Sequence, residues 1–330
     1  MVCLGLVACH SESYEARLHV FGTWVTIQLQ GIDTDQAESL ITAINSDFQQ
    51  LHHDWHAWQP GQLDQLNRAL AQGLSYPISP QLADLLRRAT QLEAHSQGTF
   101  NAAIGNLIRA WGFHTSDYPV TQAPPDVEQI EQLLRPQPSL QDLVLSEDRA
   151  RSENPAVRID LGGIAKGAAL ARAHTMIAPL APDRMLINAG GDLLAWSHSK
   201  PWRIAIRDPS NPRAALGIVQ THGLTAIFSS GNYTRNRDED QKRGHIIDPR
   251  TGQPIEHTLS ATVIASDPVL ADAAATALVV AGPLRWRQVA STMGIEQALV
   301  VAADGCLEVT PALLKIIEWT DPPSCLDDSP

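Results

Sequence analysis

The chain has 330 residues, 44% hydrophobic and 18% charged, which is an ordinary composition for a globular protein. Its formal net charge of −12 argues against a nucleic-acid partner, because binding to a phosphate backbone needs a basic face. No stretch approaches the roughly 20 consecutive apolar residues of a membrane span. An anionic small ligand would need local compensation from a lysine, a helix N-terminus or a metal.

The N-terminus, MVCLGLVACHSE, is a short apolar run that ends in Leu6-Val7-Ala8-Cys9. This run resembles a bacterial lipobox, in which the cysteine is lipidated and the leader removed. It has no basic region and is shorter than a usual signal peptide, so a plain hydrophobic start is the alternative. We expect a leader and tether over residues 1–14, with lipidation at Cys9.

The two remaining cysteine positions outside this leader are Cys306 and Cys325. They are too sparse for a disulfide framework, but they can form a single bridge in an oxidising compartment. No cysteine spacing resembles a zinc site.

The first half of the chain alternates between strand and helix patterns. Residues 17–31 alternate apolar and polar side chains, which predicts a strand with an irregularity at Gly22. Helical periodicity predicts a helix over 33–55, capped by Thr34 or Asp35, and a second one over 79–98. Prolines at 124, 125, 136 and 138 make residues 121–142 the best internal boundary, with one short helix at 126–135.

The second half mixes strands and hairpins with separate helices. Strands are predicted at 143–153, 156–161, 202–208, 224–231 and 259–266, hairpins at 184–197 and 296–310, and helices at 165–178 and 268–282. This pattern predicts an α+β fold in two lobes, about 15–120 and 143–320, within one domain of residues 15–320. Residues 321–330 are expected to form a loose tail.

The segment DLGGIAKGAA joins a carboxylate, two glycines and a lysine at the start of a helix. Gly162 and Gly163 let the backbone approach a ligand, and the following helix offers free N–H groups. Lys166 lies in the first turn, where a cation opposes the helix dipole unless an anion is bound there. The alternative is a solvated lysine beside a tight turn.

The helix DPVLADAAATALVVAG carries Asp272 and Thr276 one turn apart on one face. Small neighbours indicate that this helix is buried, so both oxygens need partners. A carboxylate and a hydroxyl suit Mg²⁺, which takes few protein ligands. The alternative is a pair bonded to neighbouring backbone.

The segment FSSGNYTRNRDEDQKRGHIIDPRTG contains a strand end, a charged loop and a turn. His245 precedes the turn and could accept a proton near neutral pH, although a structural histidine is the alternative. The glycine-bearing stretches at 98–113 and 187–192 are weaker candidates for ligand-lining loops.

No single motif identifies a family, but the order of these motifs along the chain resembles that of a known one. FGT, QLDQLNRA, GTFNAAIGNLIRAWGF, DLGGIAKGAA, INAGGD, SSGNY, GHIIDPRTG and ADAAATAL follow one another as in the ApbE flavin transferases. The chain therefore resembles the FAD:protein FMN transferase family over roughly residues 15–320. This resemblance implies a T-fold-like α+β architecture and cleavage of the FAD pyrophosphate. FMN would pass to a Thr or Ser hydroxyl of a target protein, with release of AMP.

The resemblance also implies roles for individual residues. His245 would be the base for the acceptor hydroxyl. Mg²⁺ would be held by the backbone carbonyl of Gly163 and the side chains of Asp272 and Thr276. The residues expected to contact FAD are Phe21, where the family often has methionine, together with Gly98, Thr99, Phe100, Asp160, Lys166 and Ile246.

The resemblance further implies a lipid-anchored protein on the periplasmic side of the bacterial inner membrane. Its acceptor would be a subunit of a membrane redox complex. Two alternatives use the same cavity: a magnesium-dependent FAD pyrophosphatase that gives FMN and AMP, and a non-catalytic FAD-binding lipoprotein. In the transferase and in the pyrophosphatase, Mg²⁺ and Lys166 would stabilise the charge that builds on the leaving AMP phosphate.

Overall fold

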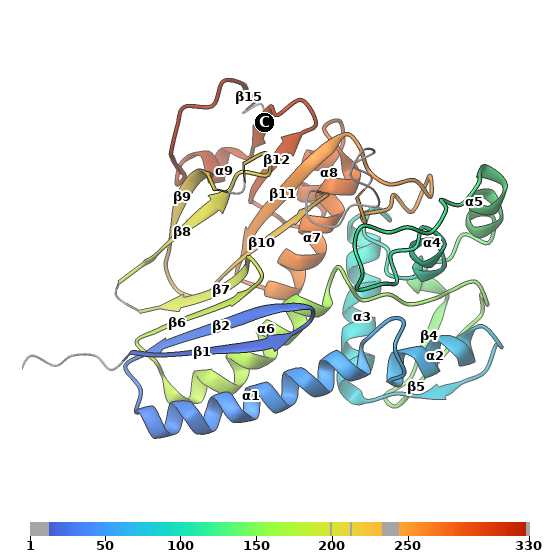
Figure 1. Cartoon of the computed structure of the whole chain (residues 1–330), viewed down its shortest axis with the longest axis horizontal. Helices are drawn as coiled ribbons and strands as arrows, with labels where there is room; N and C mark the ends of the chain where they lie inside the picture. Colours follow the sequence, from blue (N-terminus) through green and yellow to red (C-terminus); the bar gives the residue numbers. More distant parts are fainter. Residues whose placement is uncertain (1–12, 199, 212, 233–243, 328–330) are drawn as a thin grey trace, which may run out of the picture.

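The computed structural model describes residues 13–198, 200–211, 213–232 and 244–327, and within them it confirms the predicted α+β fold (Figure 1). The expected lipidation site, Cys9, lies outside the described residues. Within the described ranges, the largest sheet has nine strands and is antiparallel except between its last two. In spatial order its strands are β1 (Ser13–Val20), β2 (Thr23–Gln30), β6 (Arg184–Ala189), β7 (Asp192–Ser197), β10 (Thr225–Gly231), β11 (Thr258–Ala265), β12 (Gln297–Ala302), β13 (Leu307–Val309) and β15 (Leu326–Asp327).

Two smaller sheets, each of three strands in the described chain, flank the large one. They are β14–β9–β8 and β3–β5–β4, with bounds β3 (Tyr76–Pro77), β4 (Leu143–Leu145), β5 (Arg149–Ser152), β8 (Trp202–Arg207), β9 (Ala215–Thr221) and β14 (Glu318–Trp319). The helices are α1 (Thr34–Asp54), α2 (Gln62–Leu70), α3 (Pro80–His95), α4 (Gly105–Ala110), α5 (Val127–Leu134), α6 (Ala165–Ile177), α7 (Pro268–Ala281), α8 (Trp286–Thr292) and α9 (Pro311–Leu314), with 3₁₀ turns η1 (Leu140–Asp142) and η2 (Ala178–Leu180).

An apolar cluster packs on each face of the large sheet. Successive side chains along a strand point to opposite faces, so neighbouring residues belong to different clusters. In β10, Ala226 and Phe228 face the helices α1, α6 and α7, which lie along one face of the sheet (Figure 1). Ile227, between them, faces the opposite side and packs with residues of β8, β9 and α9. A third apolar cluster joins α4 to α5 around Leu107 and Ile130.

The predicted strand over 17–31 is wrong, because the segment is a hairpin. β1 pairs antiparallel with β2 in direct register, from Ser13 opposite Gln30 to Val20 opposite Thr23. The turn is Phe21-Gly22, with φ values of 56° and 69°, as a tight two-residue hairpin turn requires. The apolar alternation continues on both sides of this turn, so the pattern resembles one strand. β9 was not predicted at all.

The predicted strand at 156–161 is also wrong. Only an isolated bridge, between Arg158 and Ile104, forms there. The segment is held instead by two different partners: Arg158 and Asp160 donate their N–H groups to the carbonyls of Ala103 and Ala102. On the other side, the Asn67 side chain accepts from the N–H of Ile159 at 2.6 Å and donates to its carbonyl at 2.9 Å. Its apolar residues are buried as predicted, but its hydrogen bonds do not form a ladder.

The helix boundaries follow local capping chemistry. Asp33 caps α1 by accepting from the N–H of Gln36, so the cap lies one residue before Thr34 and two before Asp35, the two predicted positions. Asp267 caps α7 and is followed by Pro268 at the first helical position, as predicted. The helix α7 is buried nearly all round, so it lies in the core between the sheet and α6.

The segment 121–142 contains the expected short helix, α5, and leads through η1 into β4. Strands that precede and follow this segment in the chain belong to the same large sheet, since β2 and β6 are paired. The division into two lobes stays a prediction.

Cys306 and Cys325, for which a bridge was left open, form a disulfide beside β13. Among the described helices, none is both long and apolar enough to cross a membrane.

Candidate active site

One cavity of about 1150 Å³ collects most of the residues singled out in the sequence. Its walls come from the β1–β2 and β6–β7 turns, the α1–α2 loop, the turn before α6, the end of β10 and α7. The volume exceeds the roughly 300–1,000 Å³ of common small-molecule sites, which suits a dinucleotide. The predicted site residues that line it are Phe21, Thr99, Phe100, Asp160, Gly163, Lys166, His245, Ile246, Asp272 and Thr276.

Gly98 is the one predicted site residue, among those the structure describes, that does not line the cavity. It has a φ of 77° and donates its N–H to the carbonyl of Glu93, so it ends α3 and turns the chain into the cavity wall. Thr99 and Phe100, which follow it, are both buried.

The crossing of α6 and α7 places Asp272 beneath the glycine-lysine turn. The N–H of Gly167 donates to Oδ2 of Asp272 at 2.8 Å. A Cβ at Gly167 would lie only 2.8 Å from the carbonyl carbon of Pro268 and 2.9 Å from Cβ of Asp272, so only glycine lets the helices approach this closely. Two segments about a hundred residues apart in sequence therefore share one wall.

Asp272 is 4% exposed, and the pKa of its carboxyl is strongly raised. Burial raises the pKa of its carboxyl to about 7, with Asp192 adding to the rise, while Lys166 and the backbone N–H groups of Lys166 and Gly167 oppose it. With this pKa the carboxyl is about half ionised at neutral pH, and a cation bound beside it would favour the charged form.

Thr276, one turn after Asp272 in α7, lies beside the backbone of Gly163. The hydroxyl of Thr276 lies 3.1 Å from that of Ser230 and 3.5 Å from the carbonyl of Asp272. A Cβ placed on Gly163 would lie 3.1 Å from the Thr276 hydroxyl, so the Gly163 backbone lies against this side chain. The described residues contain no cluster of three or more His, Cys, Asp or Glu suited to a metal. One carboxylate with neutral oxygens fits Mg²⁺, which keeps most of its water or phosphate ligands.

Lys166 forms an ion pair with Asp192, the residue that follows the β6–β7 turn. Asp192 is 4% exposed at its side chain and also accepts from the N–H of Ser229 at 3.0 Å. The sequence pointed to the INAGGD stretch only as a loop, and this carboxylate was not singled out. The ion pair holds the lysine near Asp272, where its positive charge lowers the pKa of the Asp272 carboxyl and partly offsets burial.

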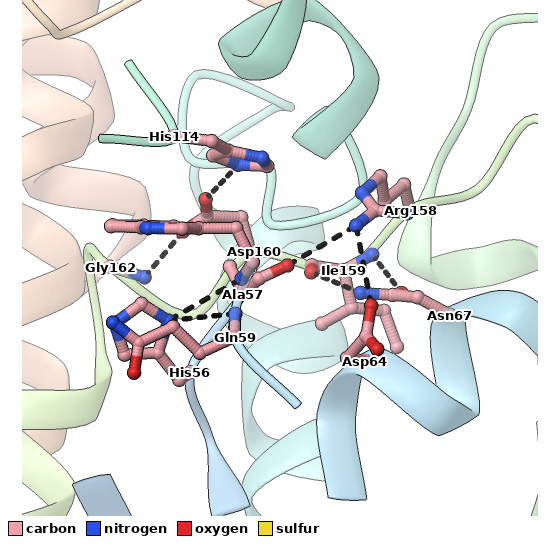
Figure 2. Close-up of polar contacts among 11 residues, drawn as sticks. His56, Ala57, Gln59, Asp64, Asn67, His114, Arg158, Ile159, Asp160 and Gly162 are labelled. Carbon is pink, nitrogen blue, oxygen red and sulfur yellow. Dashed lines mark hydrogen bonds and ion pairs between the residues drawn. The ribbon is translucent and has the colours of Figure 1, made fainter. Parts of the chain in front are cut away.

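Asp160, at the start of the glycine-lysine turn, is held as an ionised acceptor. Burial alone would raise the pKa of its carboxyl, but hydrogen bonds from His114 and from the Gly162 N–H bring it below its usual value. The donor atoms are Nε2 of His114, 2.9 Å from Oδ2, and the N–H of Gly162, 2.8 Å from Oδ1 (Figure 2). An ionised carboxylate only accepts, so it would bind hydroxyl or N–H groups of a ligand.

His245 and Ile246 reach the cavity from the segment GHIIDPRTG. A turn closed by the N–H of Gly252 on the carbonyl of Asp248 follows them, and the Arg250 side chain pairs with Asp248 at 2.7 Å. The N–H of Ile255 donates to the carbonyl of Ile246 at 3.0 Å, which fixes the strand-like run before the turn. The His245 ring lies edge-on to Phe113, with centroids 6.5 Å apart. The turn thus presents the imidazole at the cavity surface.

An aromatic wall was missed in the sequence. Phe21, His52, His56 and Trp58 form successive ring contacts between 4.3 and 5.9 Å, and all four line the cavity. Trp58 is only half-buried, and it lines the cavity. Burial lowers the pKa of both His52 and His56, so this wall is uncharged at neutral pH.

Comparison with known proteins agrees with this geometry. The model of the ApbE family matches residues 21–299. An FAD:protein FMN transferase of Rhodobacter capsulatus is 39% identical over 91% of this chain, which spans 57% of that protein's length. A second protein of that name, from Klebsiella pneumoniae, is 30% identical over 85% of this chain and 82% of its own. The crystal structure of an ApbE protein from Thermotoga maritima superposes with a TM-score of 0.82 at 26% identity, covering 92% of this chain and 99% of that one. The chain belongs to the ApbE family.

Proposed function

We propose that this chain is an FAD:protein FMN transferase, which cleaves the pyrophosphate of FAD and joins FMN to a Thr or Ser hydroxyl of a target protein. The observation that carries the proposal is the convergence of Lys166 and Asp272 on one cavity wall, with His245 on the same cavity. The names of the relatives in Rhodobacter and Klebsiella support the same reaction class.

Charge compensation is the first requirement of this reaction. The FAD pyrophosphate brings two negative charges to a chain whose net charge is already −12. We propose that Asp272, Thr276 and the Gly163 carbonyl hold Mg²⁺ here. When bound, the ion would neutralise the pyrophosphate and stabilise the charge on the departing AMP phosphate. Lys166 would supply a second positive charge, held in place by Asp192.

The remaining residues align and activate the reactants. An alcohol is a weak nucleophile at neutral pH, so His245 would remove the proton from the acceptor hydroxyl as it attacks the FMN phosphorus. Asp160 would accept hydrogen bonds from hydroxyl or N–H groups of FAD. The protein forms no covalent bond with FMN in this scheme; it aligns the reactants and stabilises charge.

Hydrolysis is the second candidate function, because water in place of the acceptor alcohol needs the same cation and base. A store of uncleaved FAD is a third candidate, but it would leave His245, Asp272 and Thr276 without a role. The transferase accounts for all three residues together.

We further propose that Cys9 is lipidated and that the chain is anchored to the periplasmic side of the bacterial inner membrane. The Cys306–Cys325 disulfide supports an oxidising compartment. A membrane-anchored enzyme would reach acceptors that are themselves subunits of membrane redox complexes.

Incubation with FAD, Mg²⁺ and a candidate acceptor subunit should give a covalent FMN adduct on the acceptor and one AMP per adduct. Mass spectrometry of the acceptor and chromatography of the nucleotides measure both products. Omitting either Mg²⁺ or the acceptor should abolish AMP release, and Asp272→Ala should lower it by at least about 100-fold through loss of charge stabilisation. Equal AMP release without acceptor would show a hydrolase instead, and full activity of Asp272→Ala would refute the metal site.

The raised pKa of Asp272 predicts a pH-dependent stability in cation-free buffer. The folded state binds this proton up to about pH 7, whereas the unfolded chain releases it near pH 4. The stabilisation that comes from this preferential proton binding is therefore fully present below pH 4 and is lost as the pH rises from 4 through about 7. Relative to wild type, Asp272→Asn should gain on the order of 4 kcal/mol between pH 4 and pH 8. Urea unfolding of both proteins across this range measures the gain, and parallel curves would contradict it. Adding Mg²⁺ at pH 8 should stabilise only the wild type.

Replacing His245 tests the base. His245→Gln should lower kcat for FMN transfer by about 100-fold or more while the dissociation constant for FAD stays within about twofold, because the step lost is proton removal. His174→Gln, in α6 outside the cavity, is the matched control and should retain wild-type kcat. A His245→Gln variant with wild-type kcat at neutral pH would rule out this role.

Lipidation at Cys9 predicts how the protein fractionates in a bacterial host. Wild type should pellet with membranes and resist a salt wash, whereas Cys9→Ser should appear in the soluble periplasmic fraction, since no described helix could span the membrane. Immunoblots of the fractions measure this. Recovery of both proteins in the same fraction would disprove the anchor.

A further inference from the structure

His114 lies directly behind the cavity wall, in the loop that follows α4. Its side chain is 5% exposed and it does not itself line the cavity. It contacts two residues that do line the cavity, from distant parts of the chain: Asp160, before α6, and Trp58, in the α1–α2 loop.

The contact with Asp160 fixes the direction of the carboxylate. Nε2 of His114 donates to Oδ2, and the Gly162 N–H holds Oδ1 (Figure 2). The backbone of Asp160 is itself anchored, because its N–H donates to the carbonyl of Ala102 at 2.8 Å. Without the histidine, one carboxylate oxygen would lose the only side-chain donor that the described residues give it. The side chain could then rotate about its own Cα–Cβ bond.

The contact with Trp58 fixes the plane of an aromatic ring. The two rings are stacked, with centroids 5.1 Å apart and planes 17° from parallel. The backbone around Trp58 is held separately: Nδ1 of His56 accepts from the Trp58 N–H at 3.4 Å, and Arg158 donates to the Ala57 carbonyl at 3.3 Å. These contacts set the loop. The indole is held between two rings, edge-on to His56 at 4.3 Å and stacked on His114 at 5.1 Å, and the stack sets its plane on the side of Asp160.

We infer that His114 is a positioning residue for FAD, which fixes the carboxylate of Asp160 through Nε2 and the indole of Trp58 by stacking. The inference rests on the proposed function, since it takes FAD as the ligand of this cavity. The carboxylate is then an oriented acceptor for a hydroxyl or N–H group of FAD. The indole is a flat surface whose orientation is set before a ring system of the ligand packs on it.

A histidine that merely fills the core would make the same packing but would not need both contacts. Nδ1 of His114 is buried and has no hydrogen-bond partner among the described residues. The imidazole therefore leaves one polar atom unsatisfied while keeping the other on Asp160. An apolar ring would fill the same space without an unsatisfied Nδ1, but it would leave Oδ2 of the buried Asp160 carboxylate without its side-chain donor, so the imidazole is kept for that contact.

Two substitutions separate the two contacts. His114→Phe keeps an aromatic face for Trp58 but removes the donor to Asp160, and His114→Gln keeps a donor of similar reach but removes the ring. The dissociation constant for FAD is measured on the full chain by quenching of flavin fluorescence, and the KM for FAD and for the acceptor are measured in the transfer assay. Thermal unfolding of each variant is recorded in parallel, with His174→Gln as the control.

We expect His114→Phe to raise both the dissociation constant and the KM for FAD by about 10-fold, and His114→Gln by about 3-fold, with the KM for the acceptor unchanged. A loss of stability alone would reduce the folded fraction and the apparent kcat but would leave these constants unchanged. Because His114 acts through Asp160, adding His114→Phe to Asp160→Asn should weaken FAD binding less than it does in wild type.

A dissociation constant for His114→Phe within about twofold of wild type would overturn the inference, as would full additivity with Asp160→Asn. If His114→Phe fails to fold, His114→Gln decides, and unchanged FAD binding in that variant refutes the stacking contact and the inference with it. Wild-type protein that binds FAD but releases no AMP would refute the proposed transferase alone. Wild-type protein that binds no FAD would refute both.

Discussion

The close crossing of α6 and α7 is the constraint on which the rest of the cavity depends. Gly167 lets the two helices meet, and its N–H then bonds directly to the buried carboxylate of Asp272. A larger residue would separate the helices and move Asp272 away from the glycine-lysine turn. Because α7 is buried nearly all round, the carboxylate has few other partners, and its charge must be stabilised from the cavity side.

The charges around this crossing explain why an anionic ligand needs a cation as well as a lysine. Lys166 already pairs with Asp192, so much of its positive charge is used within the protein. Asp160 is ionised at the start of the glycine-lysine turn, and burial keeps the histidines His52 and His56 neutral. The cavity itself therefore has little net positive charge to offer a pyrophosphate. A divalent ion held by Asp272, as proposed, would supply that charge and would oppose the effect of burial on the pKa of its carboxyl.

Local patterns predicted much of the fold, because caps and periodicity act over a few residues. Helices α1, α3 and α7 and the hairpin at Gly190-Gly191 follow from such signals. The hairpin at Phe21-Gly22 did not, since alternation continues through a two-residue turn, and residues 156–161 take their hydrogen bonds from Asn67 rather than from a strand. The family resemblance pointed to residues such as Lys166 and Asp272 that the structure brings together. Trp58, Asp192 and His114 depend on contacts between distant segments that no local pattern contains.

The two ends of the cavity are built from different kinds of structure, and this difference accounts for the role assigned to His114. The end around Asp272 is formed by helices and strand ends, whose backbone hydrogen bonds fix their side chains. The end around Trp58 is formed by loops, namely the connection between α1 and α2 and the segment after α4. Loops lack a repeating hydrogen-bond pattern, so their side chains must be fixed by specific cross-contacts. Bonds from His56 and Arg158 fix the backbone there, and among the described residues the imidazole of His114 contacts both the indole and the carboxylate across the loops. Orientation at this end therefore depends on a few individual side chains, and substitutions there should act on ligand affinity before they act on folding.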